Sequence, residues 1–481
     1  MSFWEKVVAT IRRNTKIQDI STWVKRLFKN TTTHWQEDAT LRRVIKNSSH
    51  LLSGNLIAAA LGFGQGILAV RLIGITDWGL VTTVITFASN INRLLTFRMS
   101  EVIVKRLGEV LPRSSSSSSP EAAKKLEAAV VVKTAMLTEM ATSIAAYLVL
   151  ALLTPWAANS FAKNLQTAPL FLFYGVILLT NLVAESSTGV LQALRRFDWI
   201  ARVNVFQSIA TAGLILYAFL QGQGIFGVLL AYVTGKTING IGLALLAFRE
   251  LGKTLNTDWW KVPLRSLPER RSMFMFMLNT NLNGTVNLFT RDNIPLYLAA
   301  LLNTTQVGYF KLAQSLINLI LLPLDPLIWP TYTEISRTVA QKQWNATRQL
   351  LRRVSTITAS AVFAVGSFLA LTGWFLLPLL YGEQARPAYP ALLILLVGYG
   401  FASIFQWNRP LLLALGKPGY PVLVSLLVGS VELVLIFSFV PRFGYLALAG
   451  ILSSYFVVSV GIIIWRGFSE IKRRSLYIDE V

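Results

Sequence analysis

The chain has 481 residues, of which 53% are hydrophobic and only 14% are charged. It contains no cysteine and two histidines, so it offers no thiol nucleophile, disulfide framework, Cys/His metal site or serine–histidine triad. Its formal net charge of +22 is not accompanied by an aromatic-plus-basic module for binding nucleic acid. These figures predict an all-α, polytopic membrane protein that is not an enzyme and that needs no cofactor.

Residues 1–49 precede the first long apolar run and lack the cleavage pattern of a signal peptide. Two stretches, around Trp4 and Trp23, place apolar side chains on one helical face and basic side chains outside it. We therefore expect a basic amphipathic tail that lies on the lipids of the cytoplasmic membrane surface. A tail that binds a partner protein is the alternative.

About twelve apolar segments follow, each long enough to cross a bilayer as a helix. They cover residues 50–70, 79–97, 128–152, 168–192, 202–221, 225–247, 273–300, 307–333, 354–380, 388–415, 420–440 and 445–465. Lys and Arg gather in both tails and in every second connection, whereas the other connections contain only Arg71, Lys163, Arg386 and Arg442. The positive-inside rule then places both termini in the cytoplasm, and the net charge is mainly a topology signal.

Ionisable side chains inside apolar spans are costly in lipid, so each needs a partner, water or a functional role. Those in the first half are Arg93, Lys133, Glu139, Glu185 and Lys236. Arg93 is a candidate for a cavity, whereas Lys133 is close enough to the cytoplasmic end to reach it. Glu139 lies near the middle of its span, where a carboxylate could hold a coupling ion or a structural partner.

The second half of the chain repeats parts of the first. Five identities recur at one constant offset: Leu72 with Leu301, Thr76 with Thr305, Gly79 with Gly308, Ile91 with Ile320, and Leu95 with Leu324. The stretch Leu191–Phe197 also has an echo in Leu412–Lys417. Two halves with the same orientation predict parallel repeats about an axis along the membrane normal.

We accordingly expect two six-helix bundles around a central cavity. The predicted divisions are the tail 1–49, a bundle 50–247, a cytoplasmic linker 248–272, a bundle 273–466 and a cytoplasmic tail 467–481.

The segment Met273–Leu302 carries a polar seam within an apolar helix. Asn279, Asn283, Asn287 and Arg291 recur every four residues, with Asp292 beside the last. An Arg at membrane depth costs roughly 2.5–3.5 kcal/mol on insertion scales, so lipid does not face this seam. Two interpretations remain open: contacts between packed helices, and the wall of a water-filled cavity that holds a polar or anionic substrate.

The remaining spans carry further charges and a predicted break. Lys311 is followed by Pro323, Asp325 and Pro326, which predicts a kinked or unwound segment. Further along the chain lie Arg409 and Glu432. Interior basic and acidic residues are nearly balanced, so their count does not distinguish an anionic substrate from a cationic one.

Several short motifs resemble those of the polysaccharide transporter family. They are Arg71–Gly74 followed by Asp77–Gly79, Thr96–Glu101, Leu191–Phe197, and Asp292 ahead of Val307–Phe310. This family comprises flippases of O-antigen and exopolysaccharide repeat units within the multidrug/oligosaccharidyl-lipid/polysaccharide exporter (MOP) superfamily. The resemblance covers about Ser48–Gly467. It implies alternating access by two six-helix bundles, which move a lipid-diphosphate-linked oligosaccharide to the outer leaflet of the bacterial cytoplasmic membrane.

That resemblance assigns roles to the interior polar residues. Arg suits a diphosphate because its planar fork binds two oxygens at once, and Asn suits sugar hydroxyls. The candidate substrate-binding residues are Arg291, Arg93, Asn283, Asn287, Asn279, Lys236 and Arg409. The candidate ion-coupling or structural residues are Asp292, Glu139, Asp325, Glu185 and Glu432, with H⁺ or Na⁺ as the coupling ion.

Three other functions stay open. A multidrug/cation antiporter of the same superfamily would need an acidic, aromatic-lined pocket. A membrane glycan polymerase or ligase would need catalytic groups in a large outward loop, but the longest outward connection, Leu153–Thr167, has neither an acidic residue nor a histidine. A scaffold within a polysaccharide assembly machinery would not require charged residues inside the membrane.

Overall fold

The computed structural model describes residues 39–96, 99–110, 121–255, 258–263, 293–321, 324 and 328–479. The chain divides into two units, Met1–Ser53 and Gly54–Val481. All side-chain contacts given below lie within the second unit. The regular elements of the described residues are helices, which confirms the all-α class.

The first half of the chain forms helices α3 to α10. Helix α3 (Ala39–Leu95) is bent at Gly74, whose φ of 79° belongs to the left-handed region that glycine tolerates. The following helices are α4 (Met99–Val110), α5 (Glu121–Phe161), α6 (Ala168–Gly175), α7 (Ile177–Thr180), α8 (Ala184–Ala193), α9 (Phe197–Leu220) and α10 (Ile225–Leu255). Short 3₁₀ turns follow α5 (Leu165–Thr167) and α10 (Trp259–Lys261).

The second half forms helices α12 to α18. They are α12 (Ile294–Leu301), α13 (Thr304–Leu321), α14 (Ile328–Ala340), α15 (Trp344–Tyr381), α16 (Ala388–Ile404), α17 (Asn408–Ala414) and α18 (Gly419–Asp479). Helix α18 bends at Gly444, where φ is again positive at 71°. A 3₁₀ turn (Glu383–Ala385) joins α15 to α16.

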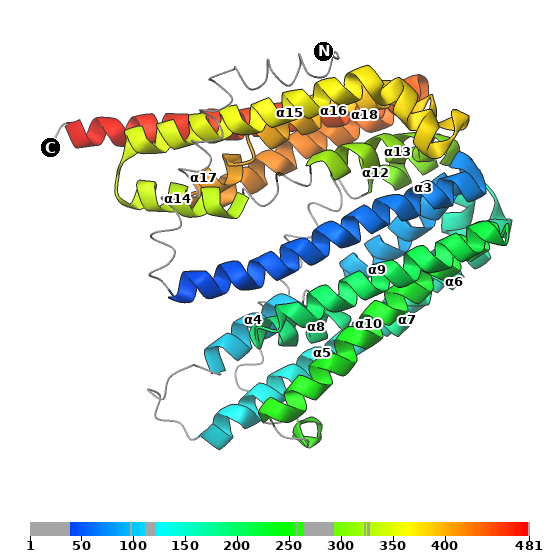
Figure 1. The fold of residues 1–481 in the computed structure, drawn as a ribbon, viewed down its shortest axis with the longest axis horizontal. Helices are drawn as coiled ribbons and strands as arrows, with labels where there is room; N and C mark the ends of the chain where they lie inside the picture. Colours follow the sequence, from blue (N-terminus) through cyan, green and yellow to red (C-terminus); the bar gives the residue numbers. More distant parts are fainter. Residues whose placement is uncertain are drawn as a thin grey trace, which may run out of the picture. The chain divides into compact units, whose positions relative to one another are not determined.

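The helices pack in two groups that follow the order of the chain (Figure 1). In the first group α8 packs on α4 and α10, α9 packs on α10, and α5 packs on α6. In the second group α16 packs on α13, α15 and α18, while α17 packs on α14 and α18. Helix α12 of the second group also contacts α5 of the first.

Eight described segments are long and apolar enough to cross a membrane. Two of them, Ile57–Leu95 with 39 residues and Gly419–Ser475 with 57 residues, are each long enough to cross twice. Their bends at Gly74 and Gly444 fall where the sequence predicts outward connections. A polytopic helical membrane protein is therefore confirmed, although the described residues give eight candidate segments rather than twelve.

The remaining difference in number has two local causes. The predicted span 273–300 lies largely outside the described residues, and the predicted span 307–333 is divided between α13 and α14.

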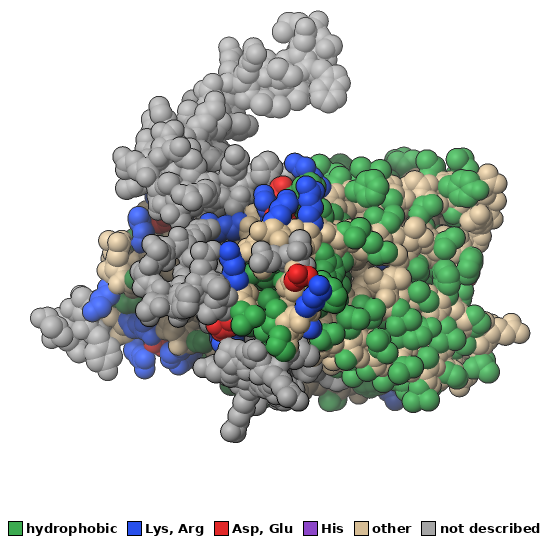
Figure 2. All heavy atoms as spheres, turned by 90° about the horizontal axis from the view of Figure 1, so that it is seen from below, with side chains coloured by type: hydrophobic (Ala, Val, Ile, Leu, Met, Phe, Trp, Pro, Cys, Tyr) green, Lys and Arg blue, Asp and Glu red, His purple; other side chains and the backbone are tan. Residues whose placement is uncertain are grey.

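Apolar side chains cover much of the outer surface of this unit. Leu152, Leu371 and Phe363 are 79%, 74% and 68% exposed. Figure 2 shows a broad apolar area over one part of the face and Lys and Arg side chains gathered toward one end of it. A soluble protein rarely exposes so much contiguous apolar surface, so this surface is suited to contact with lipid.

Two predicted spans are broken helices rather than continuous ones. The span 168–192 is divided into α6, α7 and α8, and the span 388–415 is divided into α16 and α17. Breaks inside a membrane protein require new hydrogen-bond partners for the freed backbone groups. In the second half α15 supplies one, because the Thr358 hydroxyl donates to the Ile404 carbonyl at 3.0 Å.

The turn after each broken helix has the same backbone conformation in both halves. Arg195 and Gly416 occupy equivalent places in the sequence echo, and both have positive φ, 60° and 74°. The next residue in each half, Arg196 or Lys417, donates its backbone N–H five residues back, at 2.7 and 2.8 Å. This is a helix C-terminal cap in which the left-handed residue closes the last turn. The sequence echo therefore marks a repeated structural element.

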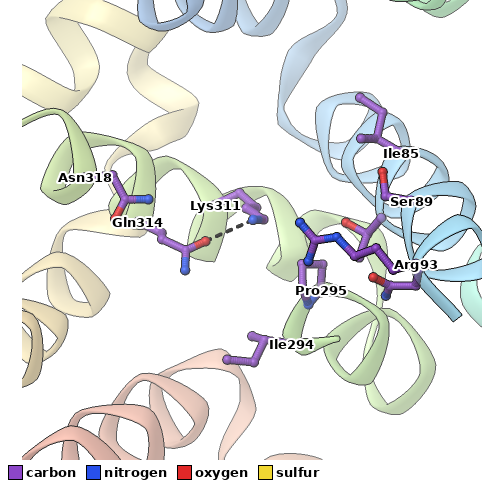
Figure 3. A pocket seen from close by; sticks show the side chains of 10 residues that line it. Ile85, Ser89, Arg93, Ile294, Pro295, Lys311, Gln314 and Asn318 are labelled. Atoms are coloured by element: carbon purple, nitrogen blue, oxygen red, sulfur yellow. Dashed lines mark hydrogen bonds between the residues drawn. The ribbon is translucent and has the colours of Figure 1, made fainter. Parts of the chain in front are cut away.

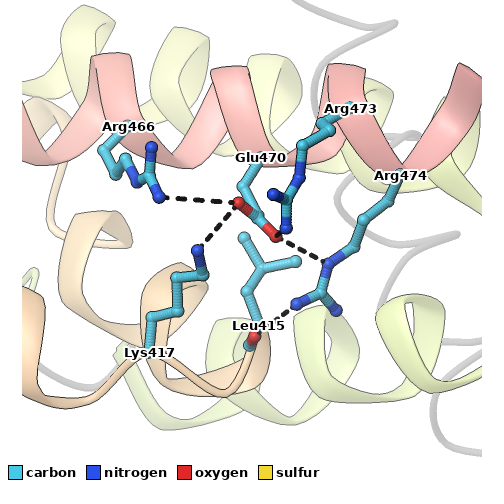
Figure 4. Close-up of polar contacts among 6 residues, drawn as sticks. All are labelled: Leu415, Lys417, Arg466, Glu470, Arg473 and Arg474. Atoms are coloured by element: carbon cyan, nitrogen blue, oxygen red, sulfur yellow. Dashed lines mark hydrogen bonds and ion pairs between the residues drawn. The ribbon is translucent and has the colours of Figure 1, made fainter.

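Each of these turns is bound to a glutamate of the last helix in its own half. Arg196 pairs with Glu250 of α10 at 2.9 Å, and Lys417 pairs with Glu470 of α18 at 3.0 Å. Each glutamate also pairs with a cation three residues later in its own helix. Lys253 lies 3.1 Å from Glu250, and Arg473 lies 2.9 Å from Glu470. Arg474 and Arg466 add two further cations around Glu470 (Figure 4). These ion pairs hold the turn of each half on its own helical group.

Two glycines lie against the backbone of the opposite half where α3 meets α13. A Cβ on Gly79 would lie 1.7 Å from the Thr304 carbonyl oxygen, and a Cβ on Gly308 would lie 2.5 Å from the Ile75 carbonyl oxygen. Gly79 and Gly308 are partners in the sequence echo, as are Ile75 and Thr304 by the same offset. The contact is therefore reciprocal, with each glycine facing the backbone just before its counterpart. Only a residue without a side chain allows this separation.

This contact predicts the effect of one added methyl group. We expect Gly79→Ala to lower the free energy of unfolding by about 1–3 kcal/mol. The added methyl group would meet a backbone carbonyl, which cannot rotate away as a side chain can. Thermal unfolding in detergent measures this difference. Gly108→Ala in α4 is the matched control, because a Cβ there meets no atom within 4 Å and alanine favours a helix. If the two variants were equally stable, Gly79 would not lie against the Thr304 backbone as described.

Candidate functional site

Two adjoining cavities lie between α3 and the helices of the second half. The first, of about 290 Å³, is lined by Ile85, Thr86, Ser89, Asn90, Arg93, Ile294, Pro295, Lys311, Gln314 and Asn318. The second, of about 430 Å³, is lined by Ala59, Gly62, Phe63, Trp78, Thr82, Ile85, Thr86, Tyr232, Lys311, Gln314, Ser315 and Asn318. Their shared residues make them two parts of one site.

Two cations face this site from opposite halves of the chain. Figure 3 shows Arg93 of α3 and Lys311 of α13 pointing toward one another across the first cavity. None of the described lining residues of either cavity is a carboxylate. The site therefore presents positive charge to a ligand.

The helical period explains why these residues share a wall. Lys311, Gln314, Ser315 and Asn318 follow the i, i+3, i+4, i+7 spacing, which places them on one face of α13. On α3 the spacing of Thr82, Thr86, Ser89 and Arg93 does the same.

Side-chain hydrogen bonds hold the polar wall in place. Lys311 Nζ donates to Gln314 Oε1 at 2.9 Å, and Gln314 Nε2 donates to the Tyr399 hydroxyl of α16 at 2.8 Å. On the other wall the Asn90 side-chain amide donates to the carbonyl of the Asn293 side chain, which links the two halves of the chain. The arrangement fixes the direction of Lys311 before any ligand binds.

Among the predicted substrate-binding residues, the structure places Arg93 in the site. Lys236 lies on α10 one turn beyond Tyr232, which lines the second cavity, so the two share a face of that helix. Arg409 lies elsewhere: its guanidinium donates to the Ser425 hydroxyl of α18 at 3.1 Å, and it does not line either cavity. The remaining predicted residues, Asn279, Asn283, Asn287, Arg291, Asp292 and Asp325, lie outside the described residues.

The predicted carboxylates of the first half have structural contacts. Glu139 is buried in α5, and its two carboxylate oxygens accept hydrogen bonds from the backbone N–H groups of Glu185 and Ser186, each at 2.8 Å. These N–H groups belong to the first turn of α8, where a helix leaves donors unsatisfied. The Glu185 side chain is exposed and accepts from the Ser100 hydroxyl of α4 at 2.7 Å. In the second half, the predicted carboxylate Glu432 is buried in α18 close to Tyr297 of α12.

The position of Glu139 predicts a loss of stability when its side chain is shortened. We expect Glu139→Ala to lower the stability by about 2–3 kcal/mol, because two buried backbone N–H groups lose their acceptor. Glu383→Ala is the control, because that carboxylate is 74% exposed in a surface ion pair. Thermal unfolding of both variants in detergent measures the effect. A role in ion coupling predicts instead that Glu139→Ala unfolds like the wild type and alters only the ion dependence of transport.

Several residues of the site were not among the predicted ones. The sequence marks Lys311 as an interior charge without giving it a substrate role, and Gln314, Asn318 and Asn90 are not among the candidate residues. The polar spacing from Lys311 to Asn318 was a readable signal in the sequence. By contrast, the Asn90–Asn293 contact joins residues 203 positions apart and leaves no local pattern.

The two halves are also joined near the Gly74 bend of α3. The Thr76 and Thr305 hydroxyls are 2.9 Å apart, and these residues are partners in the sequence echo. Arg71 donates to the carbonyls of Leu379 and Leu380 in the last turn of α15.

Lys163 makes a similar contact, because it donates to the Ala300 carbonyl in the last turn of α12 at 2.8 Å. Arg71 and Lys163 are both in connections that the sequence places outside, and each binds a helix C-terminus of the other half. Helix C-termini carry partial negative charge and unsatisfied carbonyl groups, which favour such cations.

Two solved structures with a similar fold are those of membrane transporters. An inward-facing multidrug-resistance transporter of the MATE family, in the MOP superfamily, is similar with a TM-score of 0.64 at 15% identity, over 87% of this chain and 95% of that chain. The lipid II flippase MurJ in an inward closed conformation is similar with a TM-score of 0.63 at 14% identity, over 89% of this chain and 90% of that chain. The chain thus has the fold of the MOP superfamily.

The family itself follows from the sequence match. The model of the family described as polysaccharide biosynthesis protein matches residues 44–336, so the chain belongs to that family. The inner membrane protein YghQ of Escherichia coli (strain K12) is 22% identical over 305 residues, which cover 63% of this chain and 83% of YghQ. The resemblance found in the short motifs is confirmed by these matches.

Proposed function

We propose that this protein is a flippase that moves a lipid-diphosphate-linked oligosaccharide across the bacterial inner membrane during the synthesis of a cell-surface polysaccharide. The observation that carries this proposal is the cavity between the two halves, where Arg93 and Lys311 face each other and no described lining residue is acidic. A diphosphate is bound well by two or more cationic donors that make charge-assisted hydrogen bonds to its oxygens. One cation from each half allows the bound diphosphate to bridge the halves.

The comparisons support the same proposal from a different direction. The family is one of polysaccharide biosynthesis, the fold is shared with a lipid II flippase, and a relative is named an inner membrane protein. We expect both termini in the cytoplasm, transport by alternating access, and H⁺ or Na⁺ as the coupling ion. The protein supplies no catalytic group to the substrate in this proposal, and polysaccharide assembly enzymes would be its functional partners.

The multidrug/cation antiporter remains the second candidate because of a specific observation. Phe63, Trp78 and Tyr232 line the second cavity, and aromatic rings are attractive surfaces for organic cations. Lys311 lines the same cavity and would repel such a ligand. The local charge therefore favours an anionic substrate over a cationic one.

A ligand series on the intact protein in lipid nanodiscs tests the proposal. We expect a polyprenyl diphosphate to bind roughly tenfold more tightly than the corresponding monophosphate, because the second phosphate adds a charge-assisted contact. We expect tetraphenylphosphonium not to compete. Binding of tetraphenylphosphonium that the diphosphate fails to displace would replace the flippase with the antiporter.

A further inference from the structure

The second cavity differs in chemistry from the first. Three aromatic side chains enter it from separate segments: Phe63 and Trp78 from the two parts of α3, and Tyr232 from α10. All three are partly exposed, so their surfaces are accessible within the cavity. Phe63 also packs edge-to-face against Tyr381 of α15, with ring centroids 6.3 Å apart, which restricts its orientation.

Polar groups face these rings from α13. Gln314, Ser315 and Asn318 line the second cavity and offer amide and hydroxyl groups. An aromatic ring has a negative face that attracts the weakly positive C–H groups of a sugar, whereas amides and hydroxyls can donate to and accept from sugar hydroxyls. A cavity whose lining combines aromatic rings with neutral hydrogen-bonding groups is suited to a carbohydrate.

The wall formed by α3 changes its character along the helix. From Trp78 near the Gly74 bend, the face continues through Thr82, Thr86 and Ser89 to Arg93 near the end of the helix. Fifteen residues of α-helix extend about 22 Å at 1.5 Å per residue. The aromatic and cationic ends of this wall are therefore separated by a length suited to two different parts of one ligand.

We propose that the second cavity is a carbohydrate subsite, which orients the substrate with its sugars toward Trp78 and its diphosphate toward Arg93 and Lys311. This inference rests on the proposed flippase function and adds the orientation in which the substrate is bound. The sugars lie nearer the end where Thr76 contacts Thr305, and the diphosphate stays nearer the cytoplasmic end expected from charge distribution. The sugars therefore cross the membrane ahead of the diphosphate.

Lys311 connects the two subsites. It lines both cavities, and its hydrogen bond to Gln314 connects the cationic group to the neutral wall of the carbohydrate subsite. A ligand that occupies both cavities contacts Lys311 at the junction between phosphate and sugar. An acidic sugar would gain an additional favourable contact there, whereas a basic sugar would not.

The test separates the two parts of the ligand. A polyprenyl diphosphate is compared with the same lipid carrying a disaccharide of neutral hexose, N-acetylhexosamine or hexuronic acid, by titration into nanodiscs with the intact protein. We expect at least one glycosylated ligand to bind about tenfold more tightly than the bare lipid diphosphate. Trp78→Leu and Ser315→Ala should remove this gain while leaving the affinity for the bare lipid diphosphate unchanged.

Two controls make the result specific. Arg93→Gln should weaken all the ligands alike, and Trp465→Leu should change none of them, because Trp465 is 67% exposed on α18 and lines neither cavity. If the wild type binds the lipid diphosphate but none of the disaccharides adds affinity, or if Trp78→Leu weakens bare and glycosylated ligands equally, the carbohydrate subsite is wrong and the flippase proposal stands. If the wild type binds none of these lipids, both proposals are overturned.

Discussion

The combined substitution Thr76→Cys and Thr305→Cys is expected to stop transport completely when the protein is oxidised and to restore it when the protein is reduced. The chain has no cysteine of its own, so a disulfide can form only at the introduced pair. The two hydroxyl oxygens are 2.9 Å apart, which brings the side chains within reach of a disulfide. In the proposed cycle the two halves must separate here for the substrate to leave, and a covalent bond prevents that separation.

A second cysteine pair provides a matched control. The Thr180 and Thr237 hydroxyls are 3.0 Å apart, but both residues belong to the first half, on α7 and α10. A disulfide there should leave transport intact, because each half moves as a unit. Full transport with the Thr76–Thr305 pair oxidised would show that these ends stay together and would contradict the cycle. Removing Arg71 and Lys163 should slow cross-linking of that pair, because both hold helix C-termini of the other half.

Arg93→Ala is expected to reduce the initial rate of translocation by about ten- to a hundredfold. One charge-assisted hydrogen bond is worth about 1.5–3 kcal/mol, and each 1.4 kcal/mol corresponds to a factor of ten. Arg93→Lys should retain an intermediate rate, since it keeps the charge but loses the planar fork that binds two oxygens. Translocation in proteoliposomes, measured for both variants at equal protein content, tests this order.

Arg386→Ala is the appropriate control for Arg93. Arg386 lies in a connection that the sequence predicts to be outward, is 66% exposed and pairs with nearby Glu383 at 2.7 Å. Its loss should leave the translocation rate unchanged. If Arg93→Lys behaves like Arg93→Ala, the guanidinium geometry matters more than the charge. If Arg93→Ala transports at the wild-type rate, Arg93 does not contact the substrate.

Most of the fold was predictable because the membrane limits the sequence patterns that can cross it. Backbone groups must be satisfied within lipid, so each crossing needs a long apolar helix that hydropathy reveals. The bends at Gly74 and Gly444 follow from short connections in which glycine takes a positive φ. The repeated turn at Arg195 and Gly416 was visible as an echo because the same local sequence produces the same cap.

The breaks within two spans were not predictable from local pattern. Residues 168–192 form one long, mostly apolar segment, yet the helix is interrupted before α8. The partner that satisfies the new helix end is Glu139, which lies 46 positions before Glu185 in the sequence. A carboxylate in the middle of a span indicates that it has a polar partner. It does not indicate that the partner is the backbone N–H groups at the start of another helix.

The candidate site was predictable in part for a related reason. An isolated charge within an apolar span, such as Arg93 or Lys311, is so costly in lipid that it indicates a polar environment. The neutral residues Asn90 and Gln314 carry no such cost, so nothing distinguishes them from ordinary helix contacts. Arg409 shows the limit of charge alone, because its guanidinium is directed to Ser425 rather than to either cavity.

The central claim is that this protein moves a lipid-linked diphosphate. The measurement that tests it most directly is leaflet translocation of a fluorescent polyprenyl-diphosphate oligosaccharide in proteoliposomes that contain the intact wild-type protein. We expect translocation that protein-free vesicles do not show and that excess unlabelled lipid diphosphate suppresses. Vesicles that move no such lipid but export a cationic dye would contradict it.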